Sequence, residues 1–416
     1  MGTRYAHLDG LRGIAALIVV SLHGILAFDF GLYTGLPADS HGAWDIKISG
    51  LPFLLPLAGD YAVCLFFALS GFVLAHSFSR TNLGASALIV KRYARLCLPI
   101  LAACLFSWAL LASGLTFNHD AARVIGSTWL DSQMQQEPDL LTALRDGLYG
   151  SLLALPHATS YDRALWTMGI EFMGSLLMIM TFVLLRPLRQ RRGARNWAAG
   201  VFLLLGLAGH SFFLGLFAIG AAIYLADVRA WLERIPRPGL VMLPVLILGL
   251  FLGSLPYSAA RPPYFDTLAS HALVAEPNAW QFAYPAWLQL DEESFWHAVG
   301  ALLTLLAVES WAPLRRLLSL RLPRFLGRIS FPLYLVHLPI LMSFGCGMFL
   351  LYLEAGLGLS TAAALSVAAF YLVALLVAWA STPLIETRAV AWANIGAAYA
   401  QRTRYRSDAL ANERQS

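Results

Sequence analysis

Arg12 and His23 stand at the two ends of an apolar run near the start of the chain, in the stretch LDGLRGIAALIVVSLHG. Eleven helical steps at about 100° each return to within roughly 20° of the starting direction, with a rise of about 16–17 Å. The run therefore predicts a helix in which the guanidinium and the imidazole share one face. Snorkelling to lipid headgroups would explain Arg12 alone, whereas an imidazole as deep as His23 needs hydrogen-bond partners.

A carboxylate and a basic cluster could act together with this pair. Glu171 lies in the apolar run LWTMGIEFMGSLL, where ionisable groups are costly and usually functional. A carboxylate beside His23 could fix its tautomer for general-base chemistry, so Glu171 is the expected partner of His23. The segment KRYARL adds Lys91, Arg92 and Arg95, and such a cluster suits a phosphate ligand. Ordinary positive charge at the cytoplasmic membrane surface would explain the cluster equally.

The composition indicates the elements that must position these residues. Of the 416 residues, 58% are hydrophobic and 13% charged, whereas a soluble domain carries about 25% charged residues. Apolar runs of the length of transmembrane helices recur, and they lack the alternation of barrel strands. We therefore predict an all-α polytopic membrane protein with about ten transmembrane helices. The expected spans are 11–30, 61–79, 96–115, 164–185, 196–209, 211–228, 239–257, 295–311, 329–353 and 361–382.

The basic residues predict the orientation of these spans. Of the 29 Lys and Arg residues, five fall on one set of alternate loops and the others on the opposite set. Cytoplasmic loops are the ones enriched in Lys and Arg, so both termini are expected in the cytoplasm, with the protein in the cytoplasmic (inner) membrane. The net charge of +5 then reflects attraction to anionic lipid, and no nucleic-acid partner is expected. The five basic residues on the other set of loops, which are expected to lie outside, are Lys47, Arg123, Arg145, Arg163 and Arg261.

We expect one membrane domain over residues 1–386 and a basic cytoplasmic tail over 387–416. Two long outer loops, 116–163 and 258–294, mix acidic with aromatic residues. Such a mixture suits a sugar-binding surface, and an aromatic belt at the membrane interface is the alternative. The cysteines predict buried apolar side chains rather than metal ligands or disulfides, so no metal site is expected; they are Cys64, Cys97, Cys104 and Cys346.

Five blocks of the chain resemble the acyltransferase 3 family of integral membrane acyltransferases, which includes O-acetylases of O-antigen and exopolysaccharide. Arg12 and His23 match the family's R-x10-H signature, and KRYARLCLP and LWTMGIEF match its third- and fourth-span blocks. AVCLFFALSGFVLAHSF contains Ser70, and FLGRISFPLYLVHLPIL contains Tyr334 and His337. The blocks occur in the family's order along almost the whole chain. One departure is Phe172, because many members have a second glutamate there.

The resemblance implies a reaction and roles for these residues. Acyl-CoA, in the first instance acetyl-CoA, would be a co-substrate that enters from the cytoplasm, with no permanently bound cofactor. The acyl group would pass to a hydroxyl of a carbohydrate, glycolipid or other acceptor at or near the outer face. His23 would be the general base or an acyl-carrying nucleophile, oriented by Glu171. Phosphate binding would fall to Arg12, Lys91, Arg92 and Arg95, while Ser70, Tyr334 and His337 would line the channel or pack helices.

A secondary transporter or permease is the alternative from a different functional class. In that interpretation His23, Glu171 and His337 would form a proton relay within the membrane. The chain shows no strong internal repeat of the kind found in inverted-repeat transporters, and its basic cluster precedes the third span. The sequence leaves the oligomeric state open.

Overall fold

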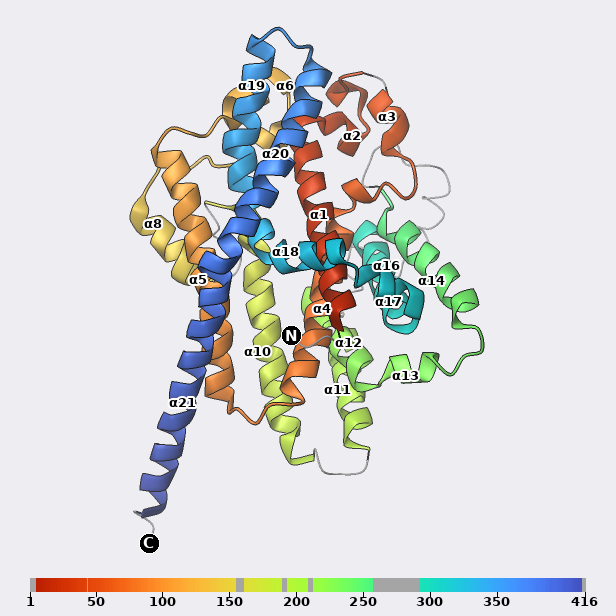
Figure 1. The fold of residues 1–416 in the computed structure, drawn as a ribbon, viewed down its shortest axis with the longest axis vertical. Coiled ribbons are helices and arrows are strands. Elements are labelled where there is room, and N and C mark those ends of the chain that lie inside the picture. The colour runs from red at the N-terminus through yellow and green to blue at the C-terminus, as the bar shows by residue number, and fades with distance from the viewer. Residues whose placement is uncertain are drawn as a thin grey trace, which may run out of the picture.

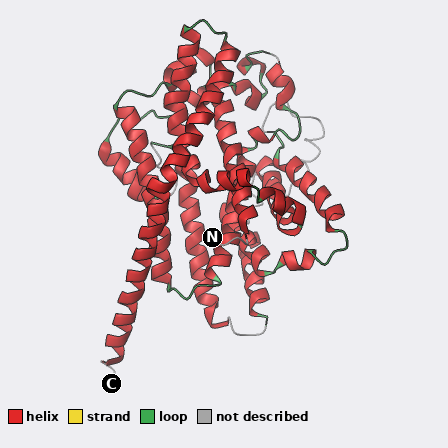
Figure 2. Cartoon of the chain, viewed as in Figure 1, coloured by secondary structure: helices red, strands yellow, loops and turns green. Residues whose placement is uncertain are grey.

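The computed structural model describes residues 5–42, 44–154, 161–188, 193–208, 212–256 and 292–413. Within these ranges the secondary structure is helical, without a β-strand (Figure 2). Most of the second long loop expected at 258–294 lies outside the described residues. The long helices are α1 (Ala6–Phe28), α4 (Gly59–Phe78), α5 (Ala85–Ala112), α10 (Trp166–Leu185), α18 (Arg321–Ile340), α20 (Leu359–Ser381) and α21 (Thr387–Glu413).

Shorter helices complete the fold. A first group is apolar or joins apolar helices: α11 (Ala194–Ala208), α12 (Phe212–Leu225), α13 (Val228–Leu232), α14 (Pro238–Gly253), α16 (Glu292–Ser310), α17 (Ala312–Leu318) and α19 (Cys346–Glu354). A second group belongs to the connections after α1 and α5: α2 (Phe30–Thr34), α3 (Trp44–Ser49), α6 (Asn118–Ile125), α7 (Thr128–Asp131), α8 (Leu140–Arg145) and α9 (Ser151–Leu153).

Each of the ten expected spans contains a helix. Among the described residues, six helices are long and apolar enough to cross a membrane. The break between α16 and α17 bends that pair by 98°, and α11, α12 and α14 are shorter apolar helices. The prediction of a multi-pass helical membrane protein is thereby confirmed. The number ten and the cytoplasmic position of both termini stay predictions.

Helix α1 lies in the middle of the molecule, and the other elements pack around it (Figure 1). It contacts α18, α4 and α20, while α12 packs on α4 and α14 packs on α16. Helix α21 runs beside α5 along one flank. Of the helices that carry the other sequence-predicted site residues, α4 and α18 thus pack directly on α1.

Helices α1 and α18 lie so close together that their backbones touch. A Cβ added to Gly13 would lie 2.5 Å from the backbone nitrogen of Gly327, and one added to Gly327 would overlap the carbonyl oxygen of Asp9. Small residues allow membrane helices to approach this closely. The approach fixes α1 against α18, so it also fixes Arg12 and His23 relative to the side chains of α18.

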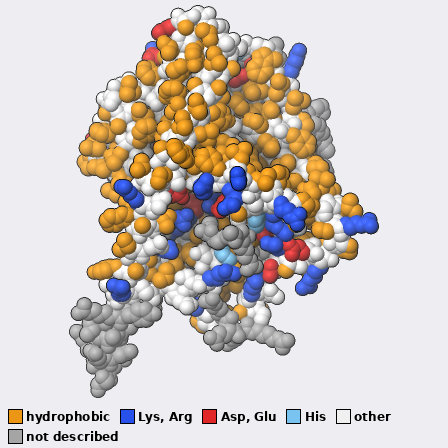
Figure 3. Space-filling model, viewed as in Figure 1, with side chains coloured by type: hydrophobic (Ala, Val, Ile, Leu, Met, Phe, Trp, Pro, Cys, Tyr) orange, Lys and Arg blue, Asp and Glu red, His pale blue; other side chains and the backbone are white. Residues whose placement is uncertain are grey.

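Apolar side chains cover much of the molecular surface. On the face shown in Figure 3 they occupy the upper part, and charged side chains gather in a band below it. Such extensive apolar surface is rare on soluble monomers, and a bilayer would cover it. Exposed examples on α14 and α20 are Leu240, Leu243, Leu372, Leu376 and Trp379.

Replacing Gly327 with alanine is predicted to destabilise the protein. An added methyl in a helix ordinarily stabilises by up to about 1 kcal/mol, but here it would overlap α1, and such overpacking costs about 1–3 kcal/mol. The matched control is Gly200→Ala in α11, because no atom outside its own helix lies within 4 Å of the new Cβ. Thermal unfolding in detergent should show a lower midpoint for Gly327→Ala only. Equal midpoints for the two variants would contradict the close approach.

Candidate functional site

Helices α1, α4, α5, α10 and α18 enclose a cavity with about 830 Å³ of empty space, its open mouth included. Three arginines and two glutamates line it: Arg12, Arg92, Arg95, Glu171 and Glu386. Hydroxyl groups and apolar side chains form the rest of the wall, among them Ser70, Thr167, Ser330, Tyr334, Phe66, Phe67 and Met168. The charged residues of three separate predicted blocks thus meet in one place.

The charges in this cavity are partly paired. Glu171 accepts a hydrogen bond from the guanidinium of Arg92, and both side chains are largely buried. Arg95 interacts electrostatically with Arg92, Arg12, Glu386 and Glu171. With three cations and two carboxylates, the lining carries a surplus of positive charge. Guanidinium groups held in this way suit a phosphate-bearing ligand.

Hydroxyl groups lie deeper in the cavity wall. The Tyr334 hydroxyl donates to the carbonyl oxygen of Ala164 at 2.9 Å, and its oxygen lies 2.9 Å from Oγ1 of Thr167. These contacts join α18 to the first turn of α10 and to the residue two positions before it. Tyr334 is also one helical turn before His337, and the two rings are 5.7 Å apart between centroids. The cavity wall therefore leads from the arginines toward His337.

His337 and His23 form a hydrogen-bonded pair whose tautomers follow from their partners. Nδ1 of His337 lies 2.8 Å from the carbonyl oxygen of Tyr334, and its Nε2 lies 2.8 Å from Nδ1 of His23. A carbonyl oxygen can only accept, so Nδ1 of His337 carries the proton and its Nε2 accepts from Nδ1–H of His23. The lone pair of His23 then resides on Nε2. This nitrogen is the one available for general-base chemistry.

Trp129 covers the other side of His23. Its ring stacks on the imidazole at 5.5 Å with an interplanar angle of 16°. The Ser127 hydroxyl accepts from the backbone N–H of Leu130, which caps α7, and donates to the carbonyl oxygen of Leu26 in α1. These bonds fix Trp129 against the end of α1 that carries His23.

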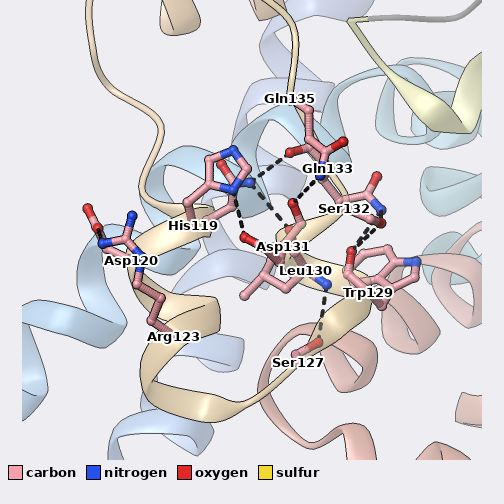
Figure 4. A network of polar contacts seen from close by, with 11 residues as sticks. His119, Asp120, Arg123, Ser127, Trp129, Leu130, Asp131, Ser132, Gln133 and Gln135 are labelled. Carbon is pink, nitrogen blue, oxygen red and sulfur yellow. Dashed lines mark hydrogen bonds and ion pairs between the residues drawn. The ribbon is translucent and has the colours of Figure 1, made fainter.

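A polar network holds the segment that carries Trp129 (Figure 4). His119 of α6 bonds Asp131 of α7 at 2.9 Å, and the Gln133 amide donates to the carbonyl oxygen of Trp129 at 3.0 Å. Most of these side chains come from α6, α7 and the residues that follow α7. The described part of the loop expected at 116–163 is thus helical in part, and its Trp129 packs directly on His23.

The expected pairing of Glu171 with His23 is wrong. Glu171 lines the cavity together with Arg12 and bonds Arg92, whereas His23 bonds His337. Glu171 therefore lies near the Arg12 end of α1. The apolar run of Glu171 predicts its helix within two residues, but a run by itself does not show which helix faces His23.

The other predicted site residues divide according to the helix face they occupy. Ser70 and Tyr334 line the cavity, as expected for channel positions, whereas His337 acts on His23 instead. Lys91 is not among the lining residues, because neighbouring residues of a helix point about 100° apart. Its predicted role beside Arg92 thus lacks structural support.

Sequence reasoning missed three polar residues of the cavity, Thr167, Ser330 and Glu386, and the aromatic residue that stacks on His23. Glu386 is the first acidic residue after the last apolar run. A carboxylate so close to a membrane span is energetically costly, and this cost could have indicated a functional residue. Thr167 directly follows the tryptophan of the LWTMGIEF block and carries the one hydroxyl group of that block. Trp129 is one of several aromatic residues in the loop 116–163, and no local signal relates it to His23.

A buried carboxyl group precedes α10. Asp162 is 3% exposed; its Oδ1 accepts from the backbone N–H of Ala164, and its Oδ2 has no partner among the described residues. Burial raises the pKa of Asp162 to about 8. The folded protein therefore holds a proton that the unfolded chain releases above about pH 4, and stability should fall as pH rises from about 4 to 8.

Asp162→Asn is predicted to flatten this pH dependence. One such group changes the free energy of unfolding by about 1.4 kcal/mol per pH unit within the window, and an amide does not ionise. Unfolding midpoints in detergent between pH 5 and 8 should fall less steeply for Asp162→Asn than for the parent. Asp120→Asn, at an exposed ion pair with Arg123, is the control. If the unfolding midpoint of Asp162→Asn fell with pH as steeply as that of the parent, Asp162 would not be the group responsible.

Comparison with known proteins gives a consistent result. The acyltransferase domain of the acyltransferase 3 family matches residues 5–382. Acyltransferase clz18 of Cochliobolus lunatus is 25% identical over 417 residues, covering 83% of this chain and 84% of its own. Acyltransferase R4 of a Phoma species is 24% identical, covering 83% and 84%. O-acetyltransferase PaAT-1 of Phomopsis amygdali is 25% identical, covering 81% and 72%.

No solved structure matches the chain. The family match covers almost the whole chain and includes the helices that form the cavity and the histidine pair. Such a family implies an acyl donor, a hydroxyl acceptor and a surrounding lipid bilayer. The chain therefore belongs to the acyltransferase 3 family and is a membrane O-acyltransferase.

Proposed function

We propose that this enzyme transfers an acetyl group from cytoplasmic acetyl-CoA to a hydroxyl of a carbohydrate or glycolipid at or near the outer membrane face. One observation carries the proposal: a polar path leads from an arginine-lined cavity, past Tyr334, to a histidine pair whose tautomers leave Nε2 of His23 as the base. The path has the cation cluster at one end and the base at the other. A transporter would require neither this polarity nor the family match.

The arginine end would bind the nucleotide part of the donor. Arg92 is held by Glu171, and Arg95 and Arg12 lie in the same cavity. A guanidinium that is already oriented loses less conformational entropy when it binds phosphate. The basic loops support a cytoplasmic position for this end and for both termini. The pantetheine arm would then extend along the Arg12–His23 face of α1.

His23 would activate the acceptor. Its Nε2 takes the proton of the acceptor hydroxyl while that oxygen forms a bond to the thioester carbonyl carbon. The carbon–sulfur bond then breaks, and the CoA thiolate leaves and regains a proton from His23. The acceptor gains the acyl group, and no oxidant or metal is consumed. His337 positions the imidazole throughout, because its Nε2 accepts from Nδ1–H of His23.

The surroundings of His23 support a sugar-like acceptor. The Trp129 ring lies against the imidazole, on a segment that includes exposed acidic side chains such as Asp120 and Asp131. Aromatic faces and acidic groups together suit a carbohydrate with several hydroxyls. The acetyl group and the oxygen acceptor are supported by the similarity to O-acetyltransferase PaAT-1 of Phomopsis amygdali.

His23→Ala is predicted to lower acetyl transfer by about 10²–10⁴-fold, because it removes the general base. His337→Ala should also lower it, and His337→Gln should recover part of the activity because its amide oxygen can accept from His23. Mass spectrometry of acetylated glycans and lipids from cells that produce each variant would measure the transfer. Full activity in His23→Ala, or equal losses in the two His337 variants, would refute these roles.

Arg92→Ala combined with Arg95→Ala is predicted to raise the KM for acetyl-CoA by at least about tenfold with a smaller effect on the acceptor KM, because charge-assisted bonds to phosphate are lost. Lys91→Ala is the matched control, since Lys91 does not line the cavity. Free CoA at millimolar concentration should raise the unfolding midpoint of the parent and of Lys91→Ala, but not of the double variant. Absence of stabilisation in the parent would contradict CoA binding.

A further inference from the structure

Three side chains with metal-binding groups meet beyond the end of α1. They are Asp29, which follows α1, His41, which lies in the next connection, and Asp45 of α3. One ligand atom from each lies within 4.8 Å of the other two. We propose that these residues bind one divalent first-row transition-metal cation, such as Zn²⁺ or Mn²⁺, in a structural role.

His41 presents an unprotonated nitrogen to this cluster. Its Nε2 lies 2.8 Å from the carbonyl oxygen of Ile125, which can only accept, so Nε2 carries the proton. The lone pair is then on Nδ1, which is buried and has no hydrogen-bond partner among the described residues. Metal-binding histidines commonly donate their other ring N–H to a backbone carbonyl in this way.

The two carboxylates bring two negative charges close together. Asp45 is fully buried, and no Lys or Arg of the described residues forms an ion pair with Asp29 or Asp45. Two carboxylates held this close repel each other, and a divalent cation would neutralise them.

Hydrogen bonds hold the Asp45 carboxylate in place. It accepts from the Ser40 hydroxyl at 2.8 Å and from the backbone N–H groups of His41 and Ile46 at 2.9 and 2.7 Å. Ligand carboxylates are typically oriented by such outer contacts. One imidazole nitrogen and two carboxylate oxygens suit Zn²⁺ and Mn²⁺, whereas Mg²⁺ and Ca²⁺ prefer sites made only of oxygen.

The position of the site indicates what the cation would do structurally. Asp29 is six residues after His23, and Ile125 is four residues before Trp129. Through His41 the cation would tie the end of α1 to the end of α6. It would therefore hold the segment that carries Trp129 in place over His23, without taking part in the reaction itself.

Metal content of the purified full-length protein would test the proposal. After chelation and reloading with ZnCl₂ or MnCl₂, we expect one bound cation per chain by elemental mass spectrometry. At 100 times the Kd, the cation should raise the unfolding midpoint by about 2–5 °C. Asp29→Asn and His41→Gln should each abolish both effects, and they are preferred to Asp45→Asn because Asp45 is fully buried.

His119→Gln and Asp131→Asn are the matched controls, since these residues form a neighbouring, more exposed His–Asp pair that has no third ligand among the described residues. Both controls should keep the cation. The proposal fails if the reloaded parent holds no stoichiometric metal, if Asp29→Asn and His41→Gln keep it, or if the controls lose it as well. These measurements need neither acyl-CoA nor an acceptor, so their failure would leave the acyltransfer proposal intact.

Discussion

The hydrogen bond between His23 and His337 is the interaction on which the rest of the site depends. It joins α1 to α18 across 314 positions of sequence. It can form because the backbones of α1 and α18 touch at Gly13 and Gly327. The donor direction comes from a fixed acceptor, the carbonyl oxygen of Tyr334. A backbone group thus determines, through His337, which nitrogen of His23 can accept a proton.

The charged cavity and the histidine pair are separate parts of one path. The cavity holds three arginines but only two glutamates. The glutamates offset part of the cost of burying the guanidinium charges, and the remaining positive charge can attract an anion. Neither His23 nor His337 lines this cavity; Tyr334 connects the two parts. Placing the cations and the base at different depths suits a donor that binds by its phosphates and reacts at its far end.

The short helices α6 and α7 determine what surrounds the base. Trp129 stacks on His23, and the α6–α7 segment is fixed by contacts to Leu26 and, through His41, to Ile125. The proposed cation would act on the same connection from the other side. The chemistry at His23 therefore depends on short helices outside the long ones, as well as on the helices that cross the membrane.

The sequence by itself determined the helical membrane fold and the shared face of Arg12 and His23. These follow from hydrophobicity and helical periodicity, which are local properties of the chain, whereas the grouping of Arg12 with Arg92 and Arg95 came from the family resemblance. Only the tertiary structure decided that His337, and not Glu171, is the partner of His23. It also brought together Asp29, His41 and Asp45. Periodicity gives the face and approximate depth of a residue, but packing decides which neighbour that face meets.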